Sequence, residues 1–149
     1  MSDELRDLEA IRGWINTRPL TAAFALHCES IEPGQAVFRI DPPAEWSNPN
    51  GSVAGALILA ASDFSAGMAA VSVTGVHDYV ATVDLGLHFL RPAHEIPLYT
   101  TTHVLRTGGR TVFLHTEITD ADGEIVATGV GSFSVGRGVG RSYPIGTDL

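Results

Sequence analysis

The sequence predicts an α+β domain in which an antiparallel sheet wraps around one long central helix. Residues 55–73 are long enough for a helix and are small or apolar nearly all round, which is typical of a helix buried on most sides. Four strand-like segments joined by short turns follow this helix, as in an antiparallel meander. A meander of that size has one face to cover, and the apolar helix is the element available to cover it.

Composition limits both the organisation and the partners of the protein. A chain of 149 residues is expected to form a single domain, spanning residues 1–149. The formal charge of −8, with nine basic residues and no lysine, argues against a nucleic-acid or anionic-membrane binder. It leaves room for a few arginines that bind one phosphorylated ligand. The charged N-terminus lacks the apolar segment of a signal peptide, which predicts a cytoplasmic protein.

Three elements are expected before the central helix. Residues 3–15 carry apolar side chains at helical spacing, which predicts an N-terminal helix. Residues 21–30 and 36–40 have the composition of two strands, and the turn residues 32–34 separate them. Residues 41–52 are dense in Pro, Asn and Gly, which predicts a loop that leads into the central helix.

The second half of the chain is expected to be all strand. The predicted strands are residues 80–90, 97–107, 110–119 and 124–135. Alternation in the first strand places one set of side chains on one face, Val83, Leu85, Leu87 and Phe89, and another on the opposite face, Thr82, Asp84, Gly86 and His88. The tail, residues 137–149, is rich in glycine and is expected to be mobile.

One carboxylate interrupts the apolar helix. Asp63 is its only charged residue. Burying an unpaired carboxylate costs several kcal/mol, about as much as the whole stability of a domain. Asp63 is therefore expected to have a specific partner or to line a cavity. A purely structural, hydrogen-bonded carboxylate is the alternative interpretation.

Several residues around this helix occur at the spacing of a known family. Asn48 lies six positions before Ala54, which precedes Gly55, and Asp63 lies nine positions after Ala54. The stretch ATVDLGLHFLRPA and the turn Gly-Gly-Arg at residues 108–110 follow. Over residues 36–135 the chain resembles the hotdog-fold acyl-CoA thioesterases of the phenylacetic-acid (PaaI) type, in the family that is similar to 4-hydroxybenzoyl-CoA thioesterase.

The chain departs from this family at the start of the helix. Ala54 stands where the family has His, and Ala56 stands where it has a second Gly. The family's oxyanion donor is a backbone N–H, which maps to Gly55. This donor does not depend on the neighbouring side chain, so the departure leaves it in place.

The resemblance implies hydrolysis of an acyl-CoA thioester to a free acid and coenzyme A. Asp63 would act as base or nucleophile, and the Gly55 N–H would bind the oxyanion at a helix N-terminus. Asn48 and Thr82 would orient the water or the thioester. Gly55 and Asp63 are about 12 Å apart along one helix, so one thioester cannot contact both in one chain. Two copies are therefore required, and the family forms homodimers or tetramers.

No metal or redox cofactor is expected, and coenzyme A enters only as part of the substrate. Its phosphates need donors at strand ends and turns. The candidates for substrate binding are Arg91, Arg106, Gly108, Gly109 and Arg110, with Phe64, Leu57 and Met68 for the acyl pocket.

The residues leave other interpretations open. The protein could be a non-catalytic acyl-CoA-binding or regulatory hotdog protein, which the missing His favours, or a hotdog dehydratase or hydratase. Residues 48–51 could be only a turn, Thr82 a plain strand residue, and any single arginine a surface charge. The six histidines show no metal-site spacing, and Cys28 is expected to pack in a strand.

Overall fold

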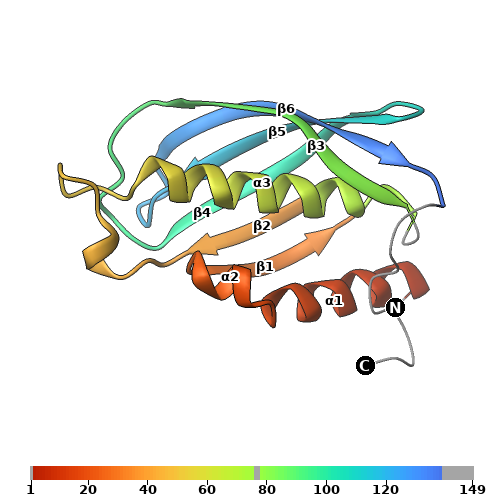
Figure 1. Cartoon of the computed structure of the whole chain (residues 1–149), viewed down its shortest axis with the longest axis horizontal. Coiled ribbons are helices and arrows are strands. Elements are labelled where there is room, and N and C mark those ends of the chain that lie inside the picture. Colours follow the sequence, from red (N-terminus) through yellow and green to blue (C-terminus); the bar gives the residue numbers. More distant parts are fainter. Residues whose placement is uncertain (1, 76–77, 139–149) are drawn as a thin grey trace.

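The computed structural model describes residues 2–75 and 78–138 and has the α+β architecture that the sequence predicts (Figure 1). Most of the tail predicted to be mobile lies outside the described residues. The helices are α1 (Asp3–Asn16), α2 (Pro19–Ala23) and α3 (Gly55–Val71), with a 3-10 turn, η1 (Ala44–Trp46). The strands are β1 (Leu26–Glu32), β2 (Gln35–Ile40), β3 (Tyr79–Phe89), β4 (Leu98–Thr107), β5 (Thr111–Thr119) and β6 (Ile125–Gly136).

The core lies between α3 and the concave face of the sheet (Figure 1). On α3 it consists largely of fully buried small residues, Ala61, Ser62, Ser65, Ala66, Ala69 and Ala70. Opposite them lie larger buried side chains, Phe38, Ile40, Leu98, Leu114 and Ile118. Small residues let the helix approach the strands closely, so the large side chains fill the space between them. Within the described chain, no helix is both long and apolar enough to span a membrane.

The order of the strands corrects the predicted meander. The sheet is antiparallel in the order β1-β2-β4-β5-β6-β3, so β3 pairs with β6 while β4 pairs with β2. Consecutive strands are neighbours only about two-thirds of the time. Residues 90–97 are a long enough connection to cross from β3, at one edge of the sheet, to β4 in its middle. At this edge position, β3 pairs through only one side of its backbone among the described strands.

The predicted strand over residues 21–30 is also wrong at its start. Residues 19–23 form the short helix α2, which begins with Pro19 at a position where proline is favoured. The buried Thr21 hydroxyl donates to the Ile15 carbonyl at 2.8 Å, which fixes α2 against the end of α1. The strand begins only at Leu26, after Ala25 turns the chain with a φ of 53°.

A β-bulge in β3 corrects the predicted faces of that strand. The pairing with β6 shifts between Thr82 and Asp84, so Thr82 lies opposite Phe133 and Asp84 lies opposite Ser132. Directly paired residues point to the same face of a sheet. Thr82 therefore faces α3, as the buried Phe133 does, whereas Asp84 faces outward and accepts a hydrogen bond from the Ser132 hydroxyl. Bulges commonly re-aim a side chain beside a functional site.

Candidate active site

The candidate site begins with an uncovered stripe on α3. The sequence predicts burial on most sides of this helix, yet Ala56, Leu59 and Asp63 are exposed, at spacings of three and four residues. Such residues share one face of a helix. Leu59 is 40% exposed on this stripe. The helix thus presents an apolar surface interrupted by one carboxylate.

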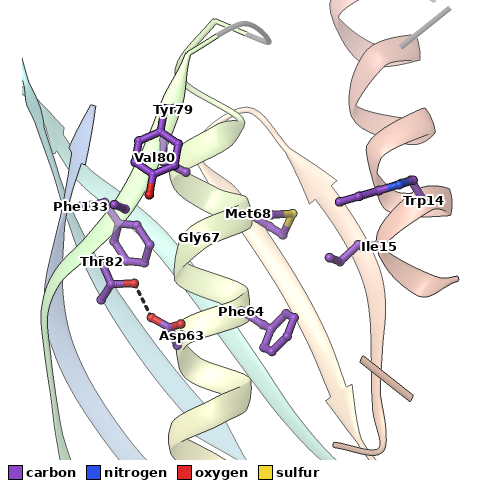
Figure 2. Close-up of a pocket in the computed structure, with 11 residues that line it drawn as sticks. Trp14, Ile15, Asp63, Phe64, Gly67, Met68, Tyr79, Val80, Thr82 and Phe133 are labelled. Carbon is purple, nitrogen blue, oxygen red and sulfur yellow. Dashed lines mark hydrogen bonds between the residues drawn. The ribbon is translucent and has the colours of Figure 1, made fainter. Parts of the chain in front are cut away.

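Asp63 has a specific hydrogen-bond partner and lines a cavity. The Thr82 hydroxyl donates to Asp63 Oδ1 at 2.7 Å, across the gap between α3 and β3 (Figure 2). This contact exists because the bulge turns Thr82 toward the helix. The second carboxylate oxygen has no partner in the described part of the chain, so it can still accept a proton or a hydrogen bond from a reactant.

The cavity beside Asp63 has a volume of about 550 Å³, which is within the usual range for a ligand site. Four elements contribute its apolar walls: α1, α3 and the paired strands β3 and β6 (Figure 2). Its lining residues are Trp14, Ile15, Asp63, Phe64, Gly67, Met68, Tyr79, Val80, Ala81, Thr82 and Phe133. Asp63 is the only carboxylate among these described residues, so it stands alone at the edge of an apolar space.

A second cavity, of about 460 Å³, surrounds the first turn of α3. Gly55, Asn48 and Arg91 line it, and the Phe89 ring lies so close that a Cβ on Gly55 would be 3.4 Å from it. Within the described chain, the Gly55 and Ala56 N–H groups donate to no other residue. The first N–H groups of a helix lack intrahelical acceptors and carry its partial positive charge. This cavity is therefore suited to an oxygen that gains negative charge.

The Asn48 side chain holds the loop that precedes this helix. Its Oδ1 accepts from the N–H groups of Asn50 and Ser52 at 2.9 and 3.1 Å, and its Nδ2 donates to the Ser52 hydroxyl at 2.8 Å. Asn48 thus forms a turn, which is the alternative interpretation of residues 48–51. Asn48 also lines the Gly55 cavity. In this geometry it positions the loop.

The candidate arginines fall into two groups. Arg91 is ion-paired at 2.6 Å with Asp120, a buried carboxylate, and also lines the Gly55 cavity. Arg106 and Arg110 are exposed on either side of the β4–β5 turn and pair with no carboxylate in the described part of the chain. At that turn Gly108 donates its N–H to the Thr111 carbonyl at 2.7 Å. Arg106 and Arg110, together with Gly109, are the groups available to an external anion.

The acyl-pocket candidates are only partly brought together. Phe64 and Met68 line the Asp63 cavity, and Phe64 also packs against Phe24 and Phe38, with ring centroids 6.4 and 6.2 Å away. Leu57 is buried and does not line this cavity. Sequence reasoning missed Trp14, Ile15, Tyr79 and Phe133. Trp14 and Ile15 gave a signal only as part of an apolar helical stripe, which indicates core packing.

No metal site is present among the described residues, where no group of three or more His, Cys, Asp or Glu side chains could hold an ion. His94 contacts the Gly51 carbonyl at 3.3 Å, beside the loop that leads to α3, while His77 lies outside the described residues. Cys28 packs in β1 as predicted, and burial raises the pKa of its thiol to about 12. Such a thiol is a poor nucleophile.

The fold is similar to those of solved thioesterases. The PaaI protein from the phenylacetic acid degradation operon of E. coli matches with a TM-score of 0.79 at 20% identity, over 89% of this chain and 95% of that one. A thioesterase from Haemophilus influenzae matches with a TM-score of 0.80 at 12% identity, over 91% and 94% of the two chains. These similarities confirm the hotdog fold.

The sequence itself also matches a family. A Saccharolobus solfataricus protein whose name is "Putative esterase" is 33% identical over 108 residues, which are 72% of this chain and 76% of the relative. The family model described as "Thioesterase superfamily" matches residues 50–127, from the loop before α3 into β6. This range includes Gly55, Asp63 and Thr82. The chain belongs to the thioesterase superfamily, and it is a thioester hydrolase with the hotdog fold.

Proposed function

We propose that the protein hydrolyses acyl-CoA thioesters to a free acid and coenzyme A, at sites that two copies of the chain build together. One observation carries this proposal. The carboxylate of Asp63, hydrogen-bonded to Thr82, lies at an apolar cavity, and the N–H donors of the same helix lie at a separate cavity. Eight residues of helix separate Asp63 from Gly55, a distance of about 12 Å.

The proposed reaction needs only water and groups of the chain. Asp63 takes a proton from a water molecule as the water oxygen adds to the thioester carbonyl carbon. The carbonyl oxygen becomes an oxyanion that accepts a hydrogen bond from the Gly55 N–H of a second copy. The intermediate then breaks its carbon–sulfur bond, and the proton on Asp63 passes to the departing sulfur. Direct attack by Asp63, through an anhydride that water then hydrolyses, is the alternative sequence of steps.

Exposed apolar surface supports the pairing of two copies. Leu59 on the α3 stripe and Val83 on the edge strand β3 are 40% and 64% exposed. Exposed apolar patches and unpaired strand edges mark surfaces that another chain covers. A two-fold axis beside this surface would set the two α3 helices antiparallel, with Asp63 of one copy opposite Gly55 of the other.

The same arrangement gives the β4–β5 turn a role in binding coenzyme A. The turn lies toward the C-terminal end of α3, because Ser72 accepts from the Gly34 N–H and the Gly34 carbonyl accepts from Val104 of β4. An antiparallel partner would bring its α3 N-terminus toward that end. Arg106 and Arg110 would then lie near the coenzyme A phosphates of the thioester bound there.

Variants of Asp63 and Gly55 test the proposal. Asp63→Asn removes the base. Gly55→Pro removes the N–H at the first position of a helix, where proline is tolerated, and Ala54 already has the extended conformation that a following proline requires. Gly55→Ala is the matched control, since it keeps the N–H. Release of free thiol from a panel of aryl and fatty acyl-CoAs should be lost in Asp63→Asn and Gly55→Pro and largely kept in Gly55→Ala.

Mixing the two inactive variants tests the shared site. A mixed dimer contains one intact Asp63 facing one intact Gly55, so random pairing should restore about a quarter of wild-type activity. No recovery, in a mixture shown to exchange subunits, would contradict the shared site. Unchanged hydrolysis by Asp63→Asn would exclude its catalytic role. Tight acyl-CoA binding by the wild type with no thiol release would favour the binding or regulatory alternative.

A further inference from the structure

One wall of the Asp63 cavity comes from a part of the chain outside the family match. Trp14 and Ile15, at the end of α1, line the cavity, whereas the family match begins at residue 50. In Figure 2 the Trp14 side chain extends from α1 toward Met68 on α3. The N-terminal segment of this chain therefore supplies this wall, whereas Asp63 on α3 and Thr82 on β3 lie within the family match.

The backbone that carries Trp14 is anchored on its C-terminal side. The Asn16 side chain donates to the Cys28 carbonyl at 3.0 Å and accepts from the Cys28 N–H at 2.7 Å, so it binds α1 to the edge strand β1. The Thr21 hydroxyl, on α2, donates a hydrogen bond to the Ile15 carbonyl at the end of α1. The Arg18 guanidinium lies 5.1 Å from the centre of the Trp14 ring, in a cation–π contact. These contacts make Trp14 a fixed wall, as a size limit requires.

The chemistry of the cavity changes from its Asp63 side to its Trp14 side. Asp63 and Thr82 supply polar groups on one side. Next to Thr82, the Phe133 ring packs against the bare backbone of Gly67. Away from Thr82, on the Trp14 side of α3, the walls are the apolar side chains of Phe64 and Met68 (Figure 2). A thioester carbonyl held at Asp63 would thus direct an apolar acyl group into this space.

We propose that Trp14 is the residue that determines acyl specificity, because its indole lines the cavity on the side of α3 away from Thr82 (Figure 2), where it limits the space for the acyl group and so favours compact hydrophobic acyl groups. This inference rests on the proposed hydrolysis at Asp63. It adds a residue on α1 that contacts the part of the acyl group distant from the reacting carbon.

Chain-length profiles of variants test the size limit. The wild type and the Trp14→Phe and Trp14→Ala variants are assayed with saturated acyl-CoAs from butanoyl to hexadecanoyl. We expect kcat/KM for the longer chains, relative to butanoyl-CoA, to rise by about tenfold or more in Trp14→Ala, with Trp14→Phe in between. Leu20→Ala is the control, an apolar residue on α2 that is 56% exposed and lines none of the described cavities. Equal changes at every chain length in Trp14→Ala would overturn the proposal.

A binding measurement separates this inference from the proposed function. The chain has two tryptophans, so Trp46→Phe leaves Trp14 as the only one. In that background with Asp63→Asn, we expect octanoyl-CoA to change the Trp14 fluorescence and free coenzyme A to leave it unchanged. Octanoyl-CoA that binds by calorimetry without altering the fluorescence would overturn the role of Trp14, even if hydrolysis is established. If octanoyl-CoA changes the Trp14 fluorescence but the wild type hydrolyses no thioester, then Trp14 contacts the acyl group and the proposed hydrolysis is wrong.

Discussion

At the scale of single residues, the hydroxyl of Thr82 is the group that holds the Asp63 carboxylate. Thr82→Val keeps the shape of the side chain and removes the donor at 2.7 Å. A hydrogen bond to a charged group contributes about 1.5–3 kcal/mol, so we expect kcat to fall by about tenfold or more. Steady-state kinetics with one acyl-CoA measures this change. Thr82→Ser, which keeps the hydroxyl, should retain most of the activity, and a wild-type kcat in Thr82→Val would contradict the role.

A buried hydroxyl in β4 gives a prediction about stability. The Thr100 hydroxyl is buried and has no hydrogen-bond partner within the described residues. An unsatisfied buried polar group costs about 1–3 kcal/mol, and valine has nearly the same shape. Thr100→Val should therefore raise the free energy of unfolding by about 1 kcal/mol, measured by urea denaturation.

The neighbouring Thr102 is the matched control for Thr100. Its hydroxyl is hydrogen-bonded to the buried Thr116 hydroxyl at 2.7 Å. Thr102→Val should lower the stability, since it leaves Thr116 with one partner fewer. If both variants shift the unfolding midpoint in the same direction, the difference in hydrogen bonding does not explain the effect.

Part of the candidate site could be predicted from single residues, and part could not. Asp63 is recognisable as a lone charge in an apolar helix, and Gly55 follows from spacing to Asp63 and Asn48. Alternation placed Thr82 with Asp84 on the same face, because a bulge of one residue leaves no mark in a hydrophobic pattern. Trp14 fits the apolar stripe of α1, so its place at a cavity depends on how α1 packs.

At the scale of secondary-structure elements, two glycines should respond oppositely to the same substitution. Gly67 lies within α3, and a Cβ there would be an ordinary 3.6 Å from the Phe133 ring. Gly67→Ala should stabilise the protein by about 0.5–1 kcal/mol through helix propensity. It should also raise KM for the bulkiest acyl groups, because Gly67 lines the cavity.

The second glycine lies where β6 pairs with the edge strand. At Gly129 a Cβ would be 2.0 Å from the Gly86 carbonyl oxygen and 2.6 Å from the Leu87 side chain. Gly129→Ala should therefore separate β3 from β6 and destabilise the protein by about 3 kcal/mol or more. Thermal unfolding of both variants measures the contrast, and two shifts of the same sign would contradict this account of the packing.

The positions of helices and strands along the chain could be predicted from the sequence more reliably than which strands lie side by side in the sheet. The central helix begins at Gly55 as predicted, and the strands after it agree with prediction to within a residue or two at each end. The position of β3 at the edge could not be deduced, since several strand orders bury the same apolar faces. The helix α2 was missed because its five residues are too few to show a period.

At the scale of the whole molecule, Asp78 joins the end of α3 to the strands β3 and β6. Its carboxylate accepts the N–H groups of Gly138 and Gly75, both at 2.9 Å, and an ion pair from Arg137 at 2.7 Å. The Gly138 N–H is the largest cause that lowers the Asp78 pKa below its usual 3.8, followed by the Gly75 N–H and, more weakly, Arg137. The ionised carboxylate is thus favoured in the folded protein.

Because the folded pKa of Asp78 is depressed, its contribution to stability is present above pH 3.8 and is lost as the pH falls below that value. Asp78→Asn should be less stable than the wild type at neutral pH, and the difference should shrink as the pH falls below about 4. Urea denaturation across this range measures it. A difference that stays constant with pH would show that the ionised form of Asp78 contributes nothing.

A second prediction for the whole molecule concerns the association of two copies through the uncovered stripe of α3. Leu59 lies one turn before Asp63 on this stripe and is 40% exposed. Leu59→Arg should leave the fold of a single chain intact, since the side chain already reaches solvent. In the proposed antiparallel pairing position 59 of one copy faces position 59 of the other, so the two introduced charges should repel and prevent the stripes from packing together. Light scattering after size exclusion should then show a monomer, and kcat/KM should fall by about a hundredfold, as when an oxyanion donor is lost.

A leucine away from the stripe, even more exposed than Leu59, supplies the comparison. Leu20 on α2 is 56% exposed, so Leu20→Arg adds the same charge without touching α3 or β3 and should keep both the dimer and the activity. A monomeric Leu59→Arg variant with full activity would place the whole reaction within one chain. Because one thioester cannot reach both Asp63 and the start of α3 in one chain, that outcome would contradict the roles proposed for these two groups. Loss of activity together with loss of the dimer is the result expected if each site takes its base and its donor from different chains.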